Sequence, residues 1–123
     1  MTTFAFDDAY AALINATAES FRRLGPHFTV SVTYAPPTEA NIAVGYLQAY
    51  NPAKLNKVAD QLFIMFYDMW HHHTVCAGPN SPLPTVISTI KTIIKLGASA
   101  EKMILGLPWV RADRENLLSL QCH

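Results

Sequence analysis

The chain has 123 residues, a length that suits one modest domain, and 50% of them are hydrophobic, enough to build a packed core. Positive and negative residues balance to a formal net charge of zero, which argues against nucleic-acid binding because that function usually requires a basic surface. No apolar stretch approaches the roughly 18 residues of a membrane-spanning helix, so we expect no membrane partner.

The first half of the chain predicts a helix, a strand and a second helix. Apolar residues at three- and four-residue spacing predict a helix over 8–24, which a Gly-Pro pair ends. The alternating segment FTVSVTY predicts a strand over 28–34, closed by the two prolines that follow it. Residues 39–50 are ambiguous and fit a short helix. An Asn-Pro pair, typical of a helix N-cap with proline in the first turn, predicts a helix over 52–58.

The second half predicts two more strands and two more helices. Residues 61–67 are nearly all apolar and too few for a buried helix, so they predict a strand buried on both faces, as in parallel sheets. A loop rich in Gly, Pro and Asn is expected over 68–83. A helix over 84–96 follows and ends at a glycine. The segment KMILGLP predicts a third strand over 102–108, and an aspartate cap predicts a final helix over 113–120.

Helices and strands therefore alternate along the chain, which predicts an α/β fold with a parallel sheet and right-handed crossovers. In such sheets functional residues gather at the carboxyl ends of the strands. Tyr34, the pair Tyr67-Asp68, and Trp109 each follow one of the three predicted strands. We expect these aromatic and acidic side chains to meet at one rim, and this convergence indicates a candidate site.

Each candidate residue also has a purely structural interpretation. Tyr67 and Asp68 are either a core tyrosine with a capping aspartate, or a phenol donor and a carboxylate that face one ligand. Trp109 is either a packing residue or a flat platform on which a sugar ring stacks. The residue types alone leave both alternatives open.

The sequence predicts neither a metal site nor a cofactor. The run from His71 to His73 lies in a predicted loop, where adjacent side chains point in different directions and do not chelate one ion well. No spacing of His, Cys and Asp indicates a nucleophilic catalyst. Cys76 and Cys122 allow one disulfide at most.

Several segments together resemble the chitinase-like glycoside hydrolases of family 18, in particular the chitobiase-like members. FIMFYD at 63–68 resembles their Met-x-Tyr-Asp segment, and MILGLPW at 103–109 resembles the strand that leads into Pro-Trp-Tyr-Gly. FTVSVTYAP at 28–36 resembles a strand that ends in an aromatic residue near a proline. The cysteine-containing loop CAGPNSPL at 76–83 follows the Tyr-Asp strand in the same order as in the family.

The family folds as a (β/α)8 TIM barrel, which typically needs about 250 residues. The resemblance therefore implies a partial barrel, about strands five to seven. Residues 1–123 would form a single partial catalytic domain that lacks the N-terminal strands and the last strand.

The resemblance also implies an activity and a site. Family members hydrolyse N-acetylglucosamine linkages, with the acetamido group of the substrate as the nucleophile and a glutamic acid as the proton donor. Tyr67 would donate a hydrogen bond to the acetamido oxygen, and Asp68 and Met65 would line the same subsite. Trp109 and Tyr34 would complete the substrate-binding set. The implied partners are N-acetylglucosamine oligosaccharides, with no cofactor and no metal.

Two departures from the family pattern limit that activity. The Asp-x-x-Asp-x-Asp-x-Glu motif that carries the catalytic acid occurs nowhere in the 123 residues, and Val110 stands where Pro-Trp-Tyr-Gly has its tyrosine. The helix DDAYAALINATAESF at 7–21 resembles the helix that directly follows the acid-bearing strand. We therefore expect the chain to begin just after the catalytic glutamate and to be inactive alone, which leaves its standing as an enzyme open.

Two alternatives to a hydrolase fragment are a non-catalytic chito-oligosaccharide-binding module and an unrelated βαβ interaction protein. Three parallel strands would leave two open sheet edges, and such edges invite pairing with another chain. The resemblance implies a lysosomal or secreted protein. The N-terminal sequence MTTFAFDDAY lacks the basic region of a signal peptide, so the chain as it stands is expected in the cytoplasm.

Overall fold

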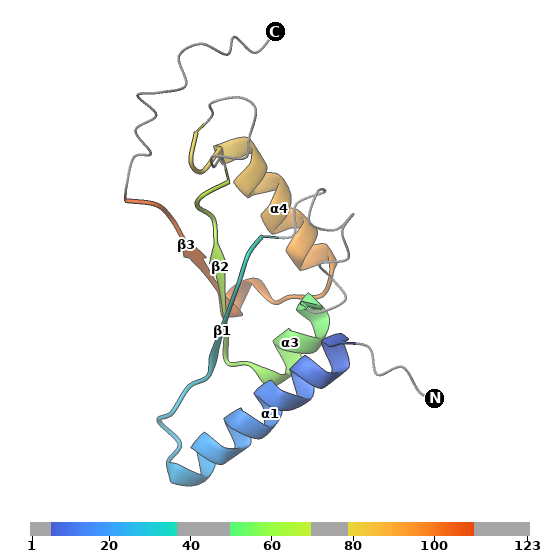
Figure 1. Ribbon diagram of the computed structural model, residues 1–123. Helices are drawn as coiled ribbons and strands as arrows, with labels where there is room; N and C mark the ends of the chain where they lie inside the picture. Colours follow the sequence, from blue (N-terminus) through green and yellow to red (C-terminus); the bar gives the residue numbers. More distant parts are fainter. Residues whose placement is uncertain (1–5, 37–49, 70–78, 110–123) are drawn as a thin grey trace, which may run out of the picture.

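The computed structural model describes residues 6–36, 50–69 and 79–109. Helices and strands alternate along these residues, as predicted, with one short 3-10 helix before the last strand (Figure 1). In chain order the elements are α1 (Phe6–Leu24), β1 (Ser31–Tyr34), α3 (Pro52–Val58), β2 (Gln61–Met65), α4 (Leu83–Lys95), η2 (Ala100–Lys102) and β3 (Met103–Gly106). The predicted final helix over 113–120 and nearly all of the ambiguous segment lie outside the described residues.

The three strands form one parallel sheet in the order β1-β2-β3. Val32 of β1 pairs with Leu62 of β2, which in turn pairs with Met103 of β3. The helices α1, α3 and α4 all lie on one side of this sheet (Figure 1). Parallel strands joined by helices on one side are the repeating unit of a (β/α)8 barrel, so the predicted fold, a partial barrel, is confirmed.

The two faces of the sheet differ in burial. On the face toward the helices, apolar side chains from β1, β2, α3, α4 and the turns after them are buried in one core. Its members are Val32, Tyr34, Leu55, Ala59, Leu62, Ile64, Phe66, Val86, Ile93 and Ala98. On the other face Phe63 and Met65 are only half-buried, and Thr33 is exposed. The prediction that 61–67 is buried on both faces is therefore wrong for one face, because no described element covers it.

Local hydrogen bonds explain where helix α3 begins and where helix α4 ends. The Asn51 side chain accepts hydrogen bonds from the backbone N–H groups of Ala53 (3.1 Å) and Lys54 (3.3 Å), which confirms the predicted N-cap of α3. After α4, Gly97 adopts a left-handed φ of 100°. Its N–H donates to the Ile94 carbonyl at 3.0 Å, the C-terminal arrangement that glycine favours.

The regular elements differ from the predicted ones at their ends. The first strand begins at residue 31 instead of 28, because the Val30 N–H donates to the Asp60 carboxylate (2.8 Å) instead of to a neighbouring strand. The second and third strands end two residues earlier than predicted, at Met65 and Gly106. The helices α1 and α4 start slightly earlier than their patterns indicated.

Candidate functional site

The carboxyl end of β2 is anchored to the neighbouring strand. Phe66, the first residue after the strand, is fully buried, and its N–H donates to the carbonyl of Gly106 at 2.9 Å. Burial alternates beyond the end of the strand, so Tyr67 is half-buried, as Met65 is. Because side chains alternate between faces, Met65 and Tyr67 lie on the side of the sheet that the helices leave uncovered.

Asp68 turns the chain sharply after the strand. It is exposed and has a φ of 53°, in the left-handed region that few residues other than glycine adopt. Its backbone N–H donates to the side-chain oxygen of Asn80, and the Asn80 side-chain amide donates to the Asp68 carboxylate at 3.4 Å. The Met69 N–H donates to the Asn80 carbonyl at 3.1 Å.

Asn80 is a residue at this site that the sequence alone did not single out. It lies in a predicted loop, between Pro79 and Pro82. Prolines on both sides fix the backbone of such a turn, and an asparagine between them is the signal that could have drawn attention to it. Its contacts with Asp68 depend on how a loop closes in space, which no local pattern shows.

A glycine forms the adjoining end of β3. Gly106 pairs with Met65, and a Cβ atom at Gly106 would lie 2.6 Å from a ring carbon of Phe63. Only glycine therefore allows the Phe63 ring to lie against this part of β3. Phe63, Met65 and Tyr67 alternate along the chain and therefore share the uncovered face.

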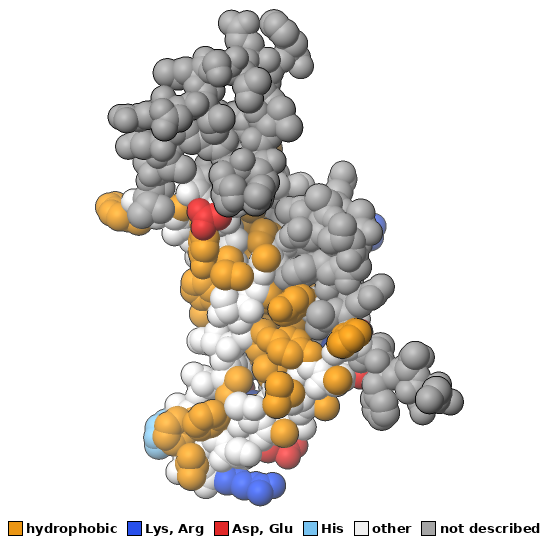
Figure 2. All heavy atoms as spheres, in the orientation of Figure 1, with side chains coloured by type: hydrophobic (Ala, Val, Ile, Leu, Met, Phe, Trp, Pro, Cys, Tyr) orange, Lys and Arg blue, Asp and Glu red, His pale blue; other side chains and the backbone are white. Residues whose placement is uncertain are grey.

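Trp109 lies three residues beyond the end of β3 and is fully exposed. Ile104, Leu105 and Leu107 on and after the same strand are also exposed. Figure 2 shows hydrophobic side chains along the side of the molecule where β3 lies. Trp109 therefore lies at the carboxyl ends of the strands, as Tyr67 and Asp68 do, and its indole is open to solvent.

Tyr34 lies apart from these residues. It pairs with Ile64 and shares the helix-covered face, where it is 1% exposed. Its ring stacks on that of Tyr50 at 6.3 Å between centroids, and its hydroxyl has no hydrogen-bond partner among the described residues. Burial raises the pKa of the Tyr34 hydroxyl to about 12. The structure therefore brings Met65, Tyr67 and Asp68 together, and places Tyr34 on the opposite face.

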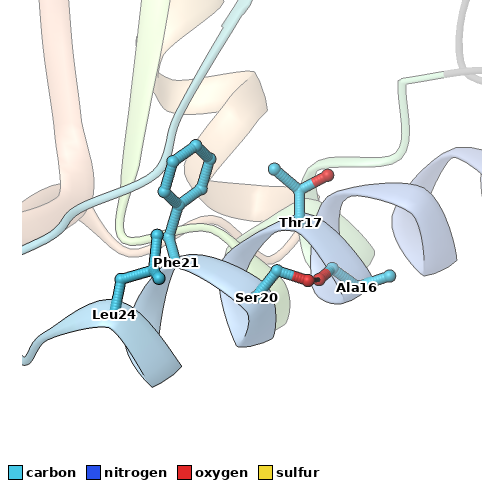
Figure 3. Close-up of a pocket in the computed structure, with 5 residues that line it drawn as sticks. All are labelled: Ala16, Thr17, Ser20, Phe21 and Leu24. Carbon is cyan, nitrogen blue, oxygen red and sulfur yellow. Dashed lines mark hydrogen bonds between the residues drawn. The ribbon is translucent and has the colours of Figure 1, made fainter.

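A hollow of about 490 Å³ lies along the C-terminal half of α1, away from this rim. It is lined by five residues of one helix face: Ala16, Thr17, Ser20, Phe21 and Leu24 (Figure 3). None of them is charged, and the Ser20 hydroxyl already donates to the Ala16 carbonyl at 2.8 Å. This hollow is an uncovered helix face, and it has no polar groups arranged around a common ligand.

Within residues 6–36, 50–69 and 79–109, no cluster of three or more His, Cys, Asp or Glu side chains is arranged to hold a metal ion. The run from His71 to His73 lies outside these ranges, as do both cysteines. None of the helices described is long and apolar enough to cross a membrane.

A family model, curated relatives and solved structures all match this chain. The model of the glycosyl hydrolases of family 18 matches residues 5–117. The di-N-acetylchitobiase of Mus musculus is 30% identical over 112 residues, which cover 86% of this chain and 28% of that protein. The human di-N-acetylchitobiase is 28% identical over 112 residues, with coverage of 86% and 27%. The chain thus spans little more than a quarter of the length of these curated relatives.

The solved structures agree on the fold. The Group IV chitinase of Ostrinia furnacalis in complex with allosamidin superposes with a TM-score of 0.68 at 20% identity. That alignment covers 85% of this chain and 30% of the chitinase chain. With the family match over most of its length and the parallel α/β units of a partial barrel, the chain belongs to the glycosyl hydrolases of family 18.

Proposed function

We propose that this chain carries the acetamido-binding part of a chitobiase-type active site, and that the 123 residues alone do not hydrolyse the sugar. The observation that carries the proposal is the position of Tyr67 and Asp68. They lie two and three residues after the end of β2, the central strand of the sheet, on the rim where barrel enzymes bind their substrates.

The chemistry of the side chains suits an N-acetylglucosamine unit. The Tyr67 hydroxyl is a donor for the acetamido oxygen, and the Asp68 carboxylate is an acceptor for the acetamido N–H. Met65 and the nearby Phe63 ring offer apolar contact to the methyl group. In substrate-assisted hydrolysis the acetamido oxygen attacks the anomeric carbon, and a carboxylate nearby stabilises the positive charge that develops.

The names of the relatives support the substrate class, because the proteins from Mus musculus and human are di-N-acetylchitobiases. Hydrolysis also needs an acid that protonates the leaving oxygen. The motif that carries this acid in the family is absent from the 123 residues. The proposal is therefore binding of N-acetylglucosamine oligosaccharides without turnover by the chain alone.

Purified chain incubated with N,N′-diacetylchitobiose tests both parts. We expect no release of N-acetylglucosamine above the uncatalysed rate, and binding in the millimolar range by isothermal titration calorimetry. Tyr67→Phe should weaken binding by about fivefold, the effect of losing one hydrogen bond of about 1 kcal/mol. Asp68→Asn should also weaken binding, because a neutral amide oxygen is a weaker acceptor for the acetamido N–H than a carboxylate. Tyr10→Phe is the matched control, because it removes the same hydroxyl group from α1, away from the proposed site. This variant should bind the disaccharide as the unmodified chain does. Turnover at an enzyme-like rate, or no binding at all, would contradict the proposal.

A non-catalytic chito-oligosaccharide-binding module is the second candidate, and the exposed indole of Trp109 favours it. An aromatic face open to solvent suits stacking on a sugar ring outside the acetamido subsite. In that case Trp109→Ala should weaken binding of a tetrasaccharide more than binding of the disaccharide. Equal effects on both sugars would count against a stacking role.

Among the described residues β1 and β3 each pair on one side only, and we infer that further barrel units, on the same or another chain, cover these edges. Location in the lysosome or outside the cell is proposed from the resemblance to family members alone. The third alternative, an unrelated interaction protein, would have been favoured by antiparallel pairing, and the observed pairing is parallel.

A further inference from the structure

We infer that Asn80 is a positioning residue that holds Asp68, and through it Tyr67, in the orientation needed to bind the acetamido group. This inference rests on the proposed function, and it adds a residue that touches the site without touching the sugar.

One side chain and one carbonyl of Asn80 fix two successive backbone N–H groups. The side-chain oxygen accepts from the Asp68 N–H, and the main-chain carbonyl accepts from the Met69 N–H at 3.1 Å. The side-chain amide also reaches the Asp68 carboxylate at 3.4 Å. Asn80 therefore restrains both the backbone turn and the carboxylate of a residue 12 positions earlier in the chain.

The backbone of Asp68 needs such a partner. A left-handed φ of 53° is less favourable than an extended backbone for a residue with a Cβ atom, although aspartate adopts it more readily than most, so contacts that hold it stabilise the turn. If the Asp68 N–H lost its acceptor, the turn could relax toward an extended backbone. That relaxation would swing the carboxylate away and shift the neighbouring Tyr67 ring.

Both sides of this contact are attached to rigid parts of the fold. Phe66, two residues before Asp68, is buried and bonded to β3. Asn80 lies shortly before α4, and Val86 and Ile93 of that helix are in the core. The Pro82 carbonyl accepts from the Val86 N–H at 3.0 Å, which ties the turn to the first turn of the helix. Asn80 thus joins the end of β2 to the start of α4.

Three variants of the full chain separate positioning from general stabilisation. Asn80→Ala removes both side-chain contacts with Asp68. Asn80→Asp keeps an acceptor for the Asp68 N–H but removes the amide donor to the carboxylate. Asn56→Ala is the matched control, because the Asn56 side chain also accepts from one distant backbone N–H, that of Ser99 at 2.9 Å. Asn56 makes this comparable contact near the amino ends of the strands, far from the rim.

Amide hydrogen exchange measured by NMR gives a readout that does not depend on the sugar. In Asn80→Ala we expect exchange at Asp68 to rise about tenfold, the effect of losing about 1.4 kcal/mol of protection, with no change at Ser99. Asn56→Ala should show the reverse, and Asn80→Asp should keep the protection of Asp68. Unchanged exchange at Asp68 in Asn80→Ala would overturn the inference.

Titration with N,N′-diacetylchitobiose is the second readout. Asn80→Ala and Asn80→Asp should both weaken binding by about fivefold or more, because both lose the contact to the carboxylate, while Asn56→Ala binds normally. Normal binding by both Asn80 variants would overturn the positioning role. If the unmodified chain itself does not bind, the proposed function fails, and the exchange data still decide whether Asn80 holds the turn.

Discussion

Asp68 combines an unusual backbone with a proposed binding role, and substitutions can separate the two. Glycine adopts a φ of 53° freely, whereas alanine in the left-handed region costs roughly 1–2 kcal/mol. We therefore expect Asp68→Gly to have a free energy of unfolding about 1 kcal/mol higher than Asp68→Ala in urea denaturation. Both variants should bind N,N′-diacetylchitobiose equally weakly, because both lack the carboxylate. An alanine variant as stable as the glycine variant would contradict the left-handed backbone.

At the scale of single residues, the sequence predicted some positions and missed others for physical reasons. Tyr67 and Asp68 could be placed at a strand end because an apolar run stops there. The face of Tyr34 relative to Met65 depends on the pairing of Tyr34 with Ile64, and strand register cannot be read from one strand alone. Asn80 was missed because its partner lies 12 residues away.

The end of α4 shows how one element depends on a single glycine. A Cβ atom at Gly97 would lie 2.8 Å from the Cβ of Ala53, and its φ of 100° disfavours any other residue. We expect Gly97→Ala to lower the free energy of unfolding by about 2 kcal/mol. Gly25→Ala is the control: the nearest atoms are in the exposed His27 ring, which can move, so the loss should stay below about 0.5 kcal/mol. Equal losses in thermal or urea denaturation would argue against this explanation.

Helix ends were easier to predict than strand ends, because they use different kinds of contact. The Asn51 cap and the Gly97 terminus rest on bonds between residues close in sequence. The start of β1 depends on Val30 donating to Asp60, a residue 30 positions away. Patterns of neighbouring residues contain the first kind of information and lack the second.

At the scale of the whole molecule, two carboxylates join α1 to the rest of the fold. Asp7 is bonded to Lys54 of α3 at 2.7 Å, and this contact lowers the pKa of the Asp7 carboxyl. The pKa of Asp60 is lowered by the hydrogen bond from the Val30 N–H and by the neighbouring Arg22 of α1, 2.8 Å away. Both ionised carboxylates therefore stabilise the folded chain.

A pH dependence follows from the direction of these shifts. A carboxyl group with a folded pKa below its unfolded value of 3.8 contributes full stability above that pH and loses it as the pH falls through the folded pKa. We expect the free energy of unfolding to fall between pH 5 and pH 2.5, values chosen on either side of the unfolded pKa by about a unit. Asp60→Asn should be less stable at pH 5 and should lose less on acidification. An identical acid dependence in the variant would contradict the contribution of Asp60.

The 123 residues match only part of the length of their family-18 relatives. The chain covers 28% of the Mus musculus relative, so a chimera can supply the remainder by replacing the matched 112 residues of that protein with this chain. If Tyr67 and Asp68 are correctly oriented, a folded chimera should hydrolyse N,N′-diacetylchitobiose, whereas we expect no hydrolysis by the isolated chain. Tyr67→Phe should lower kcat of the chimera by about 100-fold, because the acetamido oxygen loses the hydrogen bond that orients it for attack, and Tyr10→Phe should leave kcat unchanged. A chimera that binds the disaccharide but never cleaves it would show that this half of the site has lost its catalytic geometry.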